Sequence, residues 1–284
     1  MQEYLEKIRS VQNNLLCFLD DLKNAEENYQ NLLAILEDLH IHDDKNELNS
    51  FLRLIIKISN NYHRSSNFFD KISQILQYLK ADIQKYFSNH EIFNIAKSNK
   101  RILLYFTEEK LITFDEYIVQ KITSEKYVSM LYPQYFTPEI QPFINEKWFS
   151  QYFKEFDGIF KDKYNIEKYL SENFYDQRKI GENDAKICEL IRKDQIKEFI
   201  IFINTNNYDI KTTLSPSIYE TNNFLLKQKF KSITLIEYAA FFGSIQIFKY
   251  LQNEGINLTP SLWFYAIHGL NPEIIQILED KHIE

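Results

Sequence analysis

The sequence predicts an all-α protein in which a helical N-terminal bundle precedes a short helix-turn-helix solenoid. Three observations lead to this fold class. Apolar residues keep a 4-3 spacing through residues 4–39, which is typical of helices that bury one face. The segment Thr234–Asn257 joins small residues, a glycine turn and an apolar helical face, and a second copy follows at an offset of 27 residues. Five glycines in 284 residues argue against Gly-rich nucleotide cradles and α/β enzymes.

Residues 1–130 are expected to form the helical N-terminal bundle. The heptad seam in Tyr4–Leu39 predicts a long helix or a helix pair, and additional leucines and isoleucines widen its apolar stripe. A stripe this broad favours packing within the chain over a free two-stranded coiled coil. Self-association through Tyr4–Leu39, with the repeats stacked end to end, is the structural alternative.

Helix start signals divide the rest of the bundle. In chain order they are Asp44 with Glu47, Asn67, Ser88 with Glu91, and Thr113 with Glu116. Paired hydroxyl or carboxylate caps followed three residues later by Glu are capping-box patterns. They predict one helix ending near Asn60, one running to Ile83, and two within Phe93–Ile122.

A Pro/aromatic-rich connecting segment is expected over residues 131–182. Three prolines between residues 133 and 142 permit only short helical pieces. The aromatic residues from Trp148 to Phe160 fall at helical intervals, so they are interpreted as core.

Residues 183–284 are expected to hold the repeats, with copies in 183–231, 232–258 and 259–284. The residues expected to define the repeat structure are Thr234, Glu237, Ala239, Ala240, Gly243, Gly255 and Ala266. Thr234 and Glu237 form a capping-box pair, and Gly243 suits a turn that needs a positive φ. In the last copy Leu270 takes the place of Gly243. In a degenerate first copy Asp194 takes that place, and a long insert, 204–231, follows.

The central copy resembles an ankyrin repeat, with Thr234 at the Thr of Thr-Pro-Leu-His and a complete Ala-Ala-x-x-Gly core. Leu235 and Glu237 replace the Pro and His of that signature. Five runs are similar to an expanded ankyrin-repeat family of parasitic protists with a helical N-terminal region of unknown function: Asn61–Arg64, Asn99–Leu104, Tyr132–Phe136, Ile180–Asp184 and Leu235–Ala240. The resemblance implies a scaffold that binds a protein partner, and it implies no chemistry.

By that resemblance, loop tips and the exposed side of the first repeat helix would face the partner. The residues expected to do so are Phe230, Lys231, Ile233, Phe241, Phe242 and His268. Two adjacent phenylalanines would make an apolar anchor. The alternative is that these rings pack against the insert 204–231 or against the N-terminal bundle.

Other site readings carry less weight. Residues 1–50 have a net charge of −7 and residues 51–101 a net charge of +6. The basic segment 53–101 could bind nucleic acid through phosphates and stacking, but its aromatics fall on predicted core faces.

His40, His42, Asp43 and Asp44 could be metal ligands, although an ordinary helix break is preferred. Cys188 could be a nucleophile, but a buried structural thiol suits its apolar position better.

We therefore expect no enzymatic activity, cofactor or metal. Cys17 and Cys188 are too few and too far apart for a disulfide framework. The sequence shows no signal peptide and no apolar run long enough for a membrane span. An intracellular, cytoplasmic protein is expected from these features.

Overall fold

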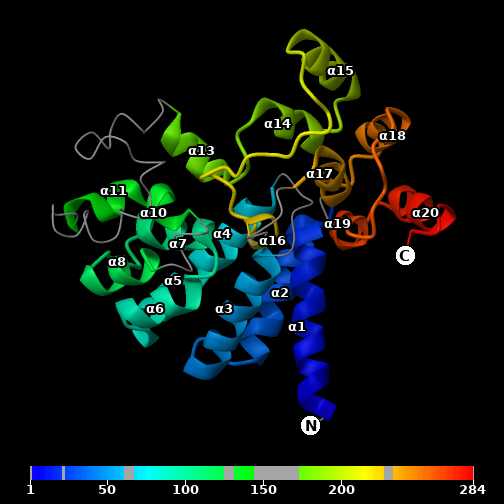
Figure 1. The fold of residues 1–284 in the computed structure, drawn as a ribbon. Helices are drawn as coiled ribbons and strands as arrows, with labels where there is room; N and C mark the ends of the chain where they lie inside the picture. Colours follow the sequence, from blue (N-terminus) through cyan, green and yellow to red (C-terminus); the bar gives the residue numbers. More distant parts are fainter. Residues whose placement is uncertain are drawn as a thin grey trace. The chain divides into compact units, whose positions relative to one another are not determined.

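The protein is all-α (Figure 1). The computed structural model describes residues 2–20, 23–60, 67–124, 131–143, 173–226 and 233–283. Within these ranges every named element is helical, and one isolated antiparallel bridge joins Thr213 to Thr234. The chain forms two compact units, Met1–Ile118 and Val119–Glu284. The sequence placed its first boundary near residue 130, whereas the structure has the second unit begin at Val119.

The first unit contains seven complete helices among the described residues and the start of an eighth. They are α1 (Gln2–Asp20), α2 (Ala25–Asp38), α3 (Lys45–Ser59), α4 (Phe68–Tyr78), α5 (Lys80–Tyr86), α6 (Asn89–Ala96), α7 (Lys100–Glu108) and α8 (Glu116–Ile122). The heptad seam forms a helix pair, because α1 and α2 pack against each other. Leu15, Leu32 and Leu36 of this seam are fully buried. The apolar face is thus used within the chain, as the intramolecular interpretation predicts.

Capping explains where several of these helices begin. Asp44 accepts hydrogen bonds from the backbone N–H groups of Asn46 and Glu47 at the start of α3. Ser88 and Glu91 form the predicted capping box of α6. The predicted cap at Thr113 is wrong, because the Asp115 carboxylate accepts the Ile118 N–H at 2.9 Å. Asp115 is therefore the N-cap residue, and α8 begins at the next residue, Glu116.

Two predicted helices are each divided in the structure. The helix expected from Asn67 to Ile83 breaks at the buried Leu79, which separates α4 from α5. The Asn99 side chain accepts a hydrogen bond from the Ile102 N–H and so starts α7 as a new helix after α6. The sequence placed Asn99 in the first of the two helices expected within Phe93–Ile122, but a short amide side chain also serves as an N-cap.

The second unit begins with short pieces around a buried arginine. These are α10 (Tyr132–Tyr135), α11 (Thr137–Ile140), the 3-10 turn η1 (Gln141–Phe143) and α13 (Phe174–Ile180). Arg178 donates to the Glu139 carboxylate at 2.8 Å and to the Tyr135 carbonyl at 3.2 Å. The Tyr135 hydroxyl donates in turn to the Arg178 carbonyl at 2.8 Å. These bonds join α13 to α10 and α11. The aromatic stripe from Trp148 to Phe160 lies outside the described residues.

Three helical hairpins follow. Their helices are α14 (Lys186–Arg192) with α15 (Ile196–Thr205), α17 (Leu235–Phe242) with α18 (Ile245–Asn253), and α19 (Leu262–Gly269) with α20 (Pro272–Asp280). A short helix, α16 (Asn223–Leu226), lies in the insert between the first two hairpins. The first helices α14, α17 and α19 are neighbours in that order, as are the second helices α15, α18 and α20. We call this arrangement the hairpin row.

Each hairpin turns through one residue with left-handed backbone geometry. These residues are Asp194 (φ +48°), Gly243 (φ +70°) and Leu270 (φ +44°). They occupy the positions that the sequence aligned with one another. Gly243 closes α17 as its C-cap, as predicted. Asp194 and Leu270 adopt the same left-handed backbone geometry although each carries a side chain, so this turn forms without glycine in the first and third hairpins.

Candidate protein-binding surface

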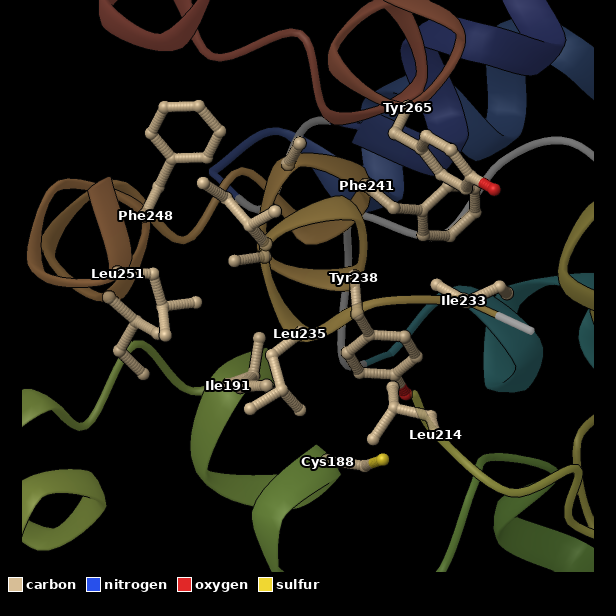
Figure 2. Close-up of a cluster of buried hydrophobic side chains, with 14 of the residues drawn as sticks. Cys188, Ile191, Leu214, Ile233, Leu235, Tyr238, Phe241, Phe248, Leu251 and Tyr265 are labelled. Atoms are coloured by element: carbon tan, nitrogen blue, oxygen red, sulfur yellow. The ribbon is translucent and has the colours of Figure 1, made fainter. Parts of the chain in front are cut away.

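The helices α17 and α19 approach each other through small residues. Ala239 and Ala240 are fully buried, and Ala266 is buried on α19. A Cβ added at Gly269 would overlap the Ala240 carbonyl oxygen and lie 3.0 Å from the Gly243 nitrogen. The absence of a side chain at Gly269 therefore sets the spacing of the second and third hairpins. Figure 2 shows the core that results, with Ile191, Leu235 and Tyr238 pointing into it.

Polar side chains link the first hairpin to the second. The Ser244 hydroxyl is buried and donates to the Ile191 carbonyl at 2.5 Å. The Asp194 carboxylate accepts the N–H groups of Gln246 and Ile247, each at 3.0 Å. These N–H groups lie in the first turn of α18, where no intrahelical acceptor exists. Asp194 thus caps a helix of the next hairpin in addition to forming its own turn.

The second and third hairpins are linked in a similar way. The Asn271 amide donates to the Gly243 carbonyl at 2.9 Å, and its oxygen caps α20. The Ser261 hydroxyl donates to Glu237 Oε1 at 2.7 Å. The other oxygen of Glu237 completes the predicted capping box with Thr234. Glu237 is therefore buried with both carboxylate oxygens bound to polar groups.

The structure buries two of the residues that the sequence assigned to the partner-facing surface. Phe241 is 3 % exposed and Ile233 is 8 % exposed. The Phe241 ring stacks on Phe224 of α16, with centroids 5.7 Å apart and planes 9° apart. The expectation that Phe241 and Ile233 face a partner is thus wrong, and the alternative of packing against the insert describes Phe241. Phe224 covers the apolar face of the Phe241 ring that a partner was expected to cover.

The remaining assigned residues are partly covered or not described. Phe242 is half-buried against Tyr238, with ring centroids 4.7 Å apart. The half-buried His268 ring lies 4.3 Å from the Phe224 ring and 5.2 Å from the Phe241 ring. Phe230 and Lys231 lie outside the described residues. The aromatic group therefore belongs mainly to the contact between the insert and the row.

A different apolar surface is exposed at the α19 end of the row. Phe264 is 66 % exposed, Ile267 is 59 % exposed and Leu270 is 51 % exposed. Phe264 and Ile267 are three residues apart and therefore lie near one another on α19, and Leu270 is the C-cap residue that follows the helix. We call them the end face. Sequence reasoning missed them, although the 27-residue offset aligns them with Glu237, Ala240 and Gly243.

The buried cysteine lies in a polar cluster that fixes the first hairpin. Burial raises the pKa of the Cys188 thiol to about 12. Arg192 donates to the Tyr238 hydroxyl at 2.9 Å and pairs with Glu182 at 2.8 Å. A thiol this basic stays protonated at neutral pH and is a poor nucleophile. The Cys188 side chain of α14 therefore suits a structural role in the core of the hairpin row.

His42 belongs to a polar cluster of the first unit. Its Nδ1 lies 2.6 Å from the Asp82 carboxylate, and its Nε2 lies 2.8 Å from the Tyr78 hydroxyl. The Tyr78 hydroxyl donates to Glu37 at 2.7 Å. Burial lowers the pKa of His42, but the hydrogen bond and charge of Asp82, helped by Glu37, outweigh this effect and raise it. The cluster ties the turn after α2 to α4 and α5.

The other features considered from the sequence have structural contacts of their own. Over the described ranges, no group of three or more His, Cys, Asp or Glu side chains is placed to hold a metal ion. A cavity of about 410 Å³ in the first unit is lined by α1, the turn at His40 and α3, with Asp44 and Glu47 among its polar groups.

In the basic segment, Lys71 is buried and donates to the Phe18 carbonyl, and the Arg101 guanidinium lies 3.9 Å from the Phe69 ring centre. These two cations make contacts within the bundle.

The fold and surface together define a class: an all-α protein with a row of helical hairpins and an exposed apolar end face. No protein-family model matches the chain, and no curated protein or solved structure matches it significantly. None of the helices in the described part of the chain is both long and apolar enough to cross a membrane.

Proposed function

We propose that the chain is a non-catalytic scaffold for protein–protein interaction, and that its ankyrin-like hairpin row holds another protein. Two features support the ankyrin-like interpretation. The helices α17 and α18 form an antiparallel pair around a Gly243 turn with a Thr234–Glu237 capping box. Neighbouring hairpins also repeat the same contacts between first helices and between second helices.

The observation that carries the proposal is the end face. Large apolar side chains are usually buried, and contiguous exposed ones mark interaction sites. Phe264 supplies an aromatic ring, which is a frequent anchor at protein interfaces. Ile267 and Leu270 follow Phe264 along the chain and would add apolar area to the contact. A partner that covers these three side chains removes apolar surface from water at little conformational cost to the row, since α19 is already packed on α17.

The titratable groups that most suggest chemistry support a structural role instead. The Cys188 thiol is buried and has a pKa of about 12. His42 is held between Asp82 and Tyr78. Both groups are engaged in contacts that position helices, which is why we favour a binding role over a catalytic one.

The test is capture of cellular proteins by the intact chain and by matched variants. Phe264→Asp with Ile267→Asp places charges on the end face. Ile201→Asp is the control, because Ile201 of α15 is equally exposed, at 64 %, but lies on a second helix of the row. We expect the double variant to lose proteins that the wild type and Ile201→Asp retain. Identical capture by all three chains, with unchanged helical circular dichroism, would overturn the proposal.

A further inference from the structure

The cavity of about 410 Å³ belongs to the first unit alone, and all of its walls come from the chain between Lys7 and Leu54. The walls are α1, the end of α2 with the turn that follows it, and α3. Helix α1 packs on α2 and α4, whereas α3 packs on α6, so different neighbours hold the two long walls in place. The volume lies within the range of pockets that hold small molecules, roughly 300–1,000 Å³.

Apolar side chains line much of this cavity. Val11 and Phe51 are buried, Leu39 and Leu54 are half-buried, and Ile8 is 42 % exposed. Ile8 and Val11 lie three residues apart on α1, so their side chains are neighbours. Phe51 and Leu54 have the same spacing on α3. Facing walls of this kind favour an occupant with an apolar body.

Three carboxylates also line the cavity, those of Asp38, Asp44 and Glu47. Oδ1 of Asp44 caps α3 by accepting two backbone N–H groups. Among the described residues, the carboxylates of Asp38 and Glu47 form no hydrogen bond or ion pair. Glu47 is half-buried, and a carboxylate that loses hydration without gaining a partner is costly. A cation in the cavity would supply that partner.

The basic groups that line the cavity leave its charge negative. Lys7 and His40 are exposed, and neither is paired with a carboxylate in the part of the chain that the structure describes. Three carboxylates outweigh these two groups whichever charge state His40 adopts. Helix α2 ends at Asp38 without a basic residue in its last turn. The partial negative charge of that helix end adds to the field of the carboxylates and favours a cation.

We propose that this cavity binds a small organic ammonium ion with an apolar body. The apolar part packs between α1 and α3 against Val11 and Phe51, and the ammonium group donates to Glu47 and to the second carboxylate oxygen of Asp44. A partner helix is about 10–12 Å across, which is too wide for a cavity of about 410 Å³. The site is independent of the end face, so failure of one assignment leaves the other standing.

NMR titration of the full chain with three probes of similar shape tests the proposal. The probes are octylammonium, octanol and octanoate. We expect octylammonium to bind, octanol to bind about tenfold more weakly because it lacks a charge-assisted hydrogen bond, and octanoate not to bind. Equal binding of octylammonium and octanoate, or no binding of octylammonium, would overturn the proposal. A helical peptide of leucine and lysine that binds where octylammonium does not would also overturn it, and would assign the cavity to a protein partner.

Two pairs of variants locate the binding. Glu47→Gln removes a lining carboxylate with little change of shape, and its control, Glu116→Gln, removes the same charge from the first turn of α8, outside the cavity. We expect Glu47→Gln to weaken octylammonium about tenfold and to leave octanol unchanged. Ile8→Ser should weaken both probes, whereas Ile201→Ser on the exposed side of α15 should weaken neither. With helical circular dichroism unchanged, wild-type affinity in Glu47→Gln, or equal loss in Glu116→Gln, would place the binding elsewhere and refute the site.

Discussion

Replacing Gly269 by Ala tests the close packing on which the hairpin row depends. The added Cβ would overlap the Ala240 carbonyl oxygen and lie 3.0 Å from the Gly243 nitrogen. Both obstacles are backbone atoms, so α17 and α19 must separate to accept the methyl group. Overpacking of this kind costs about 1–3 kcal/mol, and the better helix propensity of Ala returns at most about 1 kcal/mol. Because rigid backbone places the cost at the upper end, we expect a net loss of about 2 kcal/mol.

Urea denaturation followed by tryptophan fluorescence measures this loss. The chain has two tryptophans, and Trp148→Phe leaves Trp263 of α19 as the reporter. The Trp263 Nε1–H donates to the Ile283 carbonyl at 2.6 Å, so its environment depends on the last hairpin. A loss of about 2 kcal/mol with a slope of about 2 kcal/mol/M lowers the midpoint by about 1 M.

A second glycine provides the control. Gly255 has φ +84°, and a Cβ added there meets nothing within 4 Å. Gly255→Ala should therefore cost only the left-handed strain, about 1 kcal/mol. If Gly269→Ala is as stable as the wild type, or loses no more than Gly255→Ala, α17 and α19 do not meet closely at Gly269 and the packing argument fails.

Three further predictions concern individual side chains. Asp194→Ala removes the acceptor of two N–H groups in the first turn of α18. As for other lost helix caps, the free energy of unfolding should fall by about 1–2 kcal/mol, which calorimetry measures. The folded-state pKa of His42 is raised, so its stabilisation is complete below the unfolded pKa of about 6.5 and is lost as pH rises through the folded value. Asp82→Asn should flatten that decline in thermal stability, and an unchanged pH profile would contradict the pairing. Cys17 should react with a thiol reagent at pH 8 in the native chain while Cys188 reacts only in denaturant, because burial raises the pKa of Cys188 to about 12; rapid labelling of both native thiols would refute this.

Local signals in the sequence predicted the helices and many of their ends. Capping boxes at Ser88–Glu91 and Thr234–Glu237 are confirmed, as is the left-handed turn at Gly243. These features depend on residues within one helical turn of each other, so the sequence contains the information needed. The break at Leu79 was missed because the apolar spacing continues across it and no Gly or Pro marks it.

The candidate surface was harder to predict because it depends on contacts between distant segments. Phe241 and Phe264 are both aromatic residues on first helices of hairpins, yet one is buried and the other exposed. The two residues stand at different repeat positions, since the 27-residue offset pairs Phe241 with His268 and Phe264 with Glu237, and Phe224 of the insert also stacks on Phe241. No periodicity within the repeat shows where an insert will fold back. The offset that aligns Phe264 with Glu237 could have shown that the end face differs from the repeat pattern.

The reach of Asp194 into the next hairpin has a consequence for how the row comes apart. Two N–H groups in the first turn of α18 donate to Asp194, which lies more than fifty positions earlier at the turn of another hairpin. When the leading hairpin frays, the following helix loses its start, and Ser244 loses the carbonyl to which it is anchored. Neighbouring hairpins should therefore melt together, and a fragment cut between them should be less helical than the same residues are in the whole chain.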